Sequence, residues 1–76
     1  MAKKKIPLAA QVLLEFSRAM SHTAMAYAIE SRMAESIGCK EEAKRYAELS
    51  ANYRTNADEY RKMYRERLAH DNRKKA

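Results

Sequence analysis

A single glycine, Gly38, lies at the midpoint of this 76-residue chain, and a single proline, Pro7, lies near its start. These two residue types disfavour helix interiors most strongly, so the stretches between and beyond them are free of helix breakers. Pro7 suits the first turn of a helix, where its missing N–H is not needed. Gly38 suits the left-handed position that ends many helices. The sequence therefore predicts two long helices folded back at Gly38.

This pattern gives an all-α fold class, with two long antiparallel helices forming an α-hairpin. A lone pair of helices covers only one stripe on each, so we expect the hairpin to self-associate into a helical bundle. The chain is short enough to make one domain, residues 1–76. Its expected parts are helix 1 at about 7–37, a turn at 38–40, helix 2 at about 40–70, and basic tails at 1–6 and 71–76.

Helix 2 contains weak helix formers around 52–56, and a break there would give a three-helix bundle instead. Against this alternative, Tyr46, Tyr53 and Tyr60 recur every seven residues through the weak stretch without a change of phase. This spacing keeps the rings on one line, as expected along a contact between two helices. We therefore favour a continuous helix in which the tyrosines pack along the contact rather than stack on bases.

Two rows of apolar residues follow helix 1 at helical spacing. Together they cover more of its surface than contact with one neighbour requires. We expect the first row to face helix 2, and we interpret the second as a surface for a partner protein or for another copy of the chain. The first row is Ala9, Leu13, Phe16, Met20, Tyr27 and Ala34. The second, called the apolar row below, is Val12, Ala19, Ala26, Ile29, Met33 and Ile37.

The formal charge of +6 divides into +2 for residues 1–38 (five basic, three acidic) and +4 for residues 39–76 (eleven basic, seven acidic). A hairpin brings the two chain ends together and so creates one basic end. Basic residues there can contact phosphates or an acidic protein surface. The candidate contacts are Lys3, Lys4, Lys5, Arg61, Lys62, Arg65, Arg67, Arg73, Lys74 and Lys75.

We expect no catalytic residue, no metal site and no cofactor. His22 and His70 are remote in sequence, and no H-x-x-x-H, C-x-x-C or E-x-x-H spacing supplies further ligands. A single glycine excludes the glycine-rich loops that hold phosphates. Cys39 lies beside the start of helix 2, a position that can activate a thiol. We interpret it as a small turn residue, with a reactive thiol as the alternative.

The start of the chain resembles a signal peptide, because three lysines precede an apolar run at residues 6–14. Gln11 interrupts this run and Glu15 follows it at once, so we expect no removed signal. Glu15 also interrupts the basic face that a membrane-surface helix needs, which disfavours a membrane-surface role. The single cysteine cannot form an internal disulfide. We therefore expect a cytoplasmic protein.

These features predict a small non-enzymatic helical protein–protein interaction module, such as an adaptor, an inhibitor or an assembly component. A compact hairpin of this kind suits a phage-type or plasmid-type regulator. The expected partner is another protein, a second copy of the chain forming a homo-oligomer, or both. The alternative is an RNA- or DNA-binding regulatory protein that uses the basic open end of the hairpin.

Overall fold

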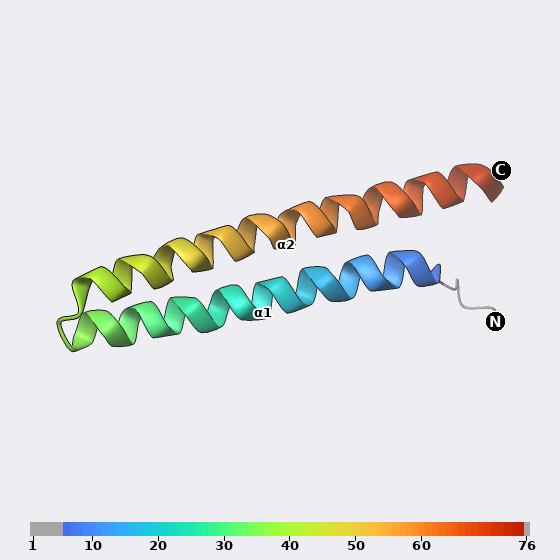
Figure 1. Cartoon of the computed structure of the whole chain (residues 1–76). Coiled ribbons are helices and arrows are strands. Elements are labelled where there is room, and N and C mark those ends of the chain that lie inside the picture. Colours follow the sequence, from blue (N-terminus) through green and yellow to red (C-terminus); the bar gives the residue numbers. More distant parts are fainter. Residues whose placement is uncertain (1–5, 76) are drawn as a thin grey trace.

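The computed structural model describes residues 6–75, which form two helices joined by a short turn (Figure 1). Helix α1 spans Leu8–Ser36 and helix α2 spans Lys40–Lys75. The helices pack side by side and antiparallel, with the start of α1 and the end of α2 at the same end of the hairpin (Figure 1). The Cα trace extends over 58 × 22 × 12 Å. The predicted all-α hairpin is confirmed.

The helix boundaries differ from the prediction at one end. Helix α2 is continuous through 52–56, so the three-helix alternative is wrong. It also continues to Lys75, where an end near 70 and a basic tail at 71–76 were expected. The basic residues of this segment do not stop a helix, because cations are favourable at its C-terminal end. Of the expected tail at 1–6, only Ile6 is described, and it is not helical.

The turn between the helices has the geometry that a glycine permits. Gly38 has a φ of +85°, in the left-handed region. Its N–H donates to the carbonyl of Glu35 (3.1 Å), and the N–H of Cys39 donates to the carbonyl of Ala34 (2.8 Å). These two bonds form a Schellman motif, which satisfies the last free carbonyls of α1. The predicted role of Gly38 as the helix-ending residue is confirmed.

Small side chains fill the contact between the two helices. The buried residues are alanines and serines, and all but Ala34 recur at intervals of seven residues on each helix. Seven residues are close to two helical turns, so such residues lie on one line along the helix. We call this contact the inner seam. Its members are Ala10, Ser17, Ala24 and Ser31 on α1, and Ala43, Ser50 and Ala57 on α2.

Serine hydroxyls bridge the inner seam in a fixed register. Each one donates to a backbone carbonyl of the opposite helix, so no buried hydroxyl in the seam is left unsatisfied. Every step of seven residues forward along α1 is matched by a step of seven residues backward along α2. The three bonds are Ser17 Oγ to Ala57 O (3.0 Å), Ser50 Oγ to Ala24 O (2.7 Å) and Ser31 Oγ to Ala43 O (2.7 Å).

Aromatic rings lie along one edge of the inner seam. Tyr27 stacks on both Tyr46 and Tyr53, with ring centroids 5.9 and 5.6 Å apart. Phe16 and Tyr60 make a tilted contact at 5.4 Å. All four tyrosines are half-buried. Such pairs add stabilisation beyond the area that they bury. The expectation that the tyrosines pack along the helix contact is confirmed for these rings.

The predicted first row of α1 lies beside the centre of the contact, not on it. Ala9 and Phe16 are exposed, and Leu13 and Met20 are half-buried along the edge. Only Ala34 of that row is buried. The reason is size: alanine and serine let the helix backbones approach closely, so the larger side chains are displaced to the flank.

Candidate functional site

Every member of the apolar row is exposed. Met33 is 58% exposed and Ile29 is 51% exposed, although both are large apolar side chains. Helix α2 therefore leaves this side of α1 uncovered. A continuous exposed apolar surface on a small protein commonly marks an interaction site. The structure brings the predicted row together along α1 and its C-cap residue Ile37, as the spacing indicated.

The exposed apolar surface is concentrated on α1. Of the large apolar residues exposed among residues 6–75, only Met63 lies on α2. Charge follows the opposite distribution. Helix α1 has five charged residues in 29 positions (two basic, three acidic), whereas α2 has eighteen in 36 (eleven basic, seven acidic). The outer surface of α1 is therefore apolar and nearly neutral, and that of α2 is strongly polar and basic.

The hydroxyl groups near the apolar row are satisfied within α1 itself, and Glu30 is a charged side chain beside the row. The hydroxyl of Thr23 donates to the carbonyl of Ala19 (2.9 Å), and that of Ser36 donates to the carbonyl of Met33 (2.7 Å). Neither hydroxyl needs a bond from a partner, so covering them carries no penalty for an unpaired donor. The surface can therefore be covered by an apolar partner.

The basic end is only partly described. Arg61, Lys62, Arg65 and Arg73 are exposed on α2. Arg67 lies 3.6 Å from the carboxylate of Asp71, so part of its charge is offset. The remaining candidates lie outside the described residues or have side chains that are not described. They are Lys3, Lys4 and Lys5 in the first group, and Lys74 and Lys75 in the second. Contact with phosphates or an acidic surface at this end stays a prediction.

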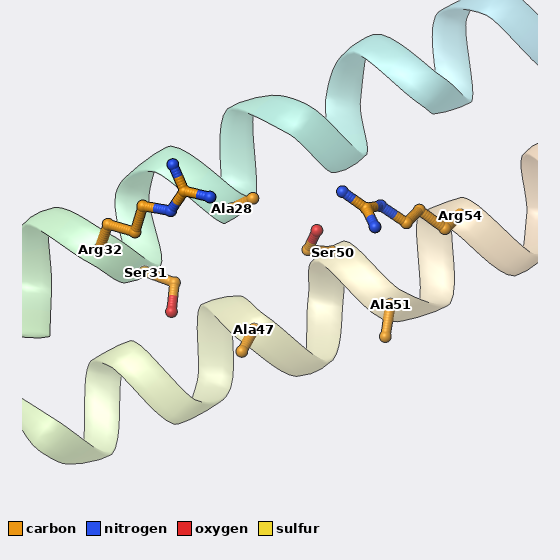
Figure 2. A pocket seen from close by; sticks show the side chains of 7 residues that line it. All are labelled: Ala28, Ser31, Arg32, Ala47, Ser50, Ala51 and Arg54. Carbon is orange, nitrogen blue, oxygen red and sulfur yellow. The ribbon is translucent and has the colours of Figure 1, made fainter.

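A shallow basic groove lies between the helices, on the edge opposite the tyrosines. Its central hollow, of about 320 Å³, is floored by alanine and serine. Arg32 of α1 and Arg54 of α2 flank it, and Figure 2 shows their guanidinium groups extending toward one another. Neither forms an ion pair with any described side chain. An adjoining hollow shares Arg54 and adds Arg61.

We did not predict this groove from the sequence, although a signal was present. Arg54 and Arg61 are seven residues apart, as are Lys40 and Ala47 before them, so all four lie on one line of α2. That line borders the inner seam. This line can be recognised as the border of a groove only when the inner seam is known. On α1, the contact with helix 2 had been assigned to larger residues. Arg32 joins the groove only because of the antiparallel register.

Other features add little chemistry. Cys39 is a half-buried free thiol in the residue before α2. Among the described residues, no cluster of three or more histidine, cysteine, aspartate or glutamate side chains is arranged to hold a metal ion. In the same part of the chain, neither helix has a segment long and apolar enough to cross a membrane. Comparison with protein-family models, with curated proteins and with solved structures gave no match.

Proposed function

We propose that this chain is a small helical protein–protein interaction module that binds its partner through the outer surface of α1. The single observation that carries this proposal is the exposure of the whole apolar row on a helix whose opposite side is already packed. Burying large apolar side chains such as Ile29 and Met33 contributes about 1.5–3 kcal/mol each when burial is complete. The row can thus supply much of a binding free energy.

The partner surface that fits is an apolar α-helix. Residues of the row recur mainly at intervals of seven, as in Val12, Ala19, Ala26 and Met33, which is the spacing that follows a neighbouring helix. Two of these four are alanines, so a second helix can approach closely. The surface offers almost no charge to pair with a polar partner. A module of this kind acts by assembling, bridging or blocking other proteins rather than by chemistry.

Two matched substitutions test this proposal. Met33→Asp places a carboxylate in the apolar row, whereas Met25→Asp places one about 80° around the same helix, in the hollow beside Arg54 and Arg61, at a similar exposure (58% and 62%). We expect wild type and Met25→Asp to retain a partner from the native host at moderate salt, and Met33→Asp to lose it. Circular dichroism should show unchanged helicity in both variants.

The retained partner is then purified and its affinity is measured by calorimetry. We expect Met33→Asp to weaken binding at least tenfold relative to Met25→Asp. Equal affinity of the two variants would refute the assignment of this surface. Unfolding by Met33→Asp alone would show that the row belongs to the internal core, which would also refute it.

A second candidate function, nucleic-acid binding, is favoured by the groove. Arg32 and Arg54 extend toward each other across it, and neither forms an ion pair with a described side chain. Two guanidinium groups in this arrangement can neutralise neighbouring phosphates without reading sequence. This location differs from the basic open end on which the sequence analysis focused.

Fluorescence anisotropy with a labelled single-stranded RNA and a labelled DNA duplex tests the second candidate across a salt series. The double variant Arg32→Gln, Arg54→Gln should lower affinity and reduce the slope of log K against log salt by about 1.5. The control Arg18→Gln, Arg45→Gln removes the same charge from each helix and should change the slope less. If the two double variants change the slope equally, nucleic acid binds elsewhere than in the groove. If no nucleic acid binds at low salt, the nucleic-acid-binding function is refuted.

A further inference from the structure

The outer surface of α1 has a more regular pattern than the apolar row alone shows. Alternating steps of four and three residues connect positions from Val12 to Ile37 along this surface. Such alternation is the spacing of a helix-packing seam. We call it the outer seam. Its members are Val12, Phe16, Ala19, Thr23, Ala26, Glu30, Met33 and Ile37.

The order of side-chain sizes along the outer seam is nearly the same from either end. Large apolar residues lie at both ends, Val12 and Phe16 at one and Met33 and Ile37 at the other. The middle positions are small (Ala19, Thr23 and Ala26) apart from Glu30. If two copies pair antiparallel about the middle, large apolar residues meet large apolar ones, Thr23 meets Ala26, and Glu30 meets Ala19. The opposed pairs are Val12 with Ile37, Phe16 with Met33, Ala19 with Glu30, and Thr23 with Ala26. A two-fold interface requires this self-complementarity.

The hairpin itself shows that this chain packs helices through small residues. In the inner seam, Ser17 and Ala24 allow α1 and α2 to approach until hydroxyls reach backbone carbonyls across the contact. Ala19 and Ala26 give the outer seam the same seven-residue spacing of small residues. Both are exposed, and Thr23 between them already donates to its own helix.

Charge favours pairing through α1 over any other helix surface of two copies. Helix α1 has a formal charge of −1 (two basic, three acidic), whereas α2 has +4 (eleven basic, seven acidic). Pairing α1 with α1 keeps the two basic helices on the outside of a four-helix arrangement, so their mutual repulsion is screened by solvent. Glu30 is the only charged member of the outer seam. It lies opposite alanine, which leaves room for its carboxylate to reach water.

The area of the seam is sufficient for a modest dimer. A helix of 29 residues is about 44 Å long at 1.5 Å per residue. Helices pack about 8–10 Å apart, so the footprint is roughly 400 Å² on each copy. The total of about 800 Å² lies below the roughly 1,000 Å² of stable specific interfaces and in the range of weak, transient ones. A second copy therefore fits, with an affinity at the weak end of the range.

We propose that the partner of the α1 surface is a second copy of this chain, paired antiparallel along the outer seam to give a two-fold four-helix assembly. The inference rests on the proposed function, because it identifies the partner of that same surface. It adds one specific prediction, that Val12 of one copy lies opposite Ile37 of the other. A parallel pair would instead bring the two Val12 residues together.

Disulfide trapping separates these arrangements. In a Cys39→Ser background, a tagged Val12→Cys chain is mixed with an Ile37→Cys chain and oxidised. The antiparallel pairing predicts a mixed disulfide between the two variants. It also predicts almost no disulfide between two Val12→Cys chains, whose cysteines would be about 37 Å apart. Light scattering of wild type at about 0.15 M salt and up to roughly 1 mM should approach twice the 8.8 kDa mass of one chain.

A monomeric mass at every concentration, with no mixed disulfide, would overturn the self-pairing. The proposed function would then be decided separately, by the binding comparison of Met33→Asp with Met25→Asp. A Val12→Cys homodimer disulfide would overturn the antiparallel register. A dimer whose mass is unaffected by Met33→Asp would contradict both the inference and the assigned surface. Circular dichroism identifies any cysteine variant that fails to fold. If one does, Phe16→Cys mixed with Met33→Cys provides a second pair of opposed positions for the same experiment.

Discussion

The two seams of α1 have the same seven-residue spacing of small residues but opposite environments. Ala24 of the inner seam is 1% exposed beneath α2, whereas Ala26 of the outer seam, two positions along, is exposed. The inner seam adds serines that bond across the contact, and the outer seam adds large apolar residues at its ends. The polar contacts that fix the register of the two helices therefore lie within the hairpin, along the inner seam. The outer seam is left as an apolar surface.

Leucine substitutions in the two seams should give the largest difference. Ala24→Leu forces extra volume into a closely packed contact, and we expect a loss of about 1–3 kcal/mol in the free energy of unfolding. Ala26→Leu should change the stability of the hairpin by about 0.5 kcal/mol or less, because it adds volume on an open surface. Urea unfolding at low protein concentration measures both. Similar losses in the two variants would show that the seams are not distinct.

Substitutions of Gly38, in the turn between the helices, should cause the next largest loss of stability. Gly38→Ala places a side chain at a φ of +85°, which costs about 1–2 kcal/mol for an L-residue. A Cβ at this position would contact nothing within 4 Å, so the cost is conformational and not steric. Gly38→Asn should lose less, since asparagine tolerates this region better. Thermal unfolding compares the two variants, and equal melting temperatures would contradict this explanation.

Removing a serine hydroxyl from the inner seam should have a smaller effect. Ser17→Ala deletes a buried bond to the carbonyl of Ala57, with an expected loss of about 0.5–1.5 kcal/mol in unfolding free energy. The carbonyl keeps its place in α2, so the value should lie at the lower end. Thr23→Ala is the control, because its bond to Ala19 lies within one exposed helix. A larger loss from the control would disprove a stabilising role for the cross-helix bond.

The helices and the turn could be predicted from the sequence because local rules decide them. Gly38 and the absence of other breakers determined the hairpin, and the tyrosine phase correctly predicted a continuous α2. On α1, the inner seam was missed because apolar size was taken as the mark of burial. In a close helix pair the smallest residues are buried most deeply, so Ser17 is fully buried while Phe16 beside it is 46% exposed.

The candidate site was predicted only in part. The apolar row was identified correctly as a surplus surface, since helical spacing alone gives its members one side of α1. The groove between Arg32 and Arg54 could not be predicted in the same way. Its two arginines lie on different helices, and the register that brings them together depends on hydrogen bonds such as Ser50 to Ala24.

Sedimentation equilibrium tests most directly the central claim that two copies of the chain associate through the outer surface of α1. Wild type, Met33→Asp and Met25→Asp are compared under identical conditions. The two variants make the same chemical change on the same helix and differ in whether it lies in the apolar row or in the hollow beside Arg54 and Arg61. We predict that wild type and Met25→Asp associate to twice the mass of one chain, and that Met33→Asp remains a folded monomer. Association of Met33→Asp as strong as that of Met25→Asp would contradict the account.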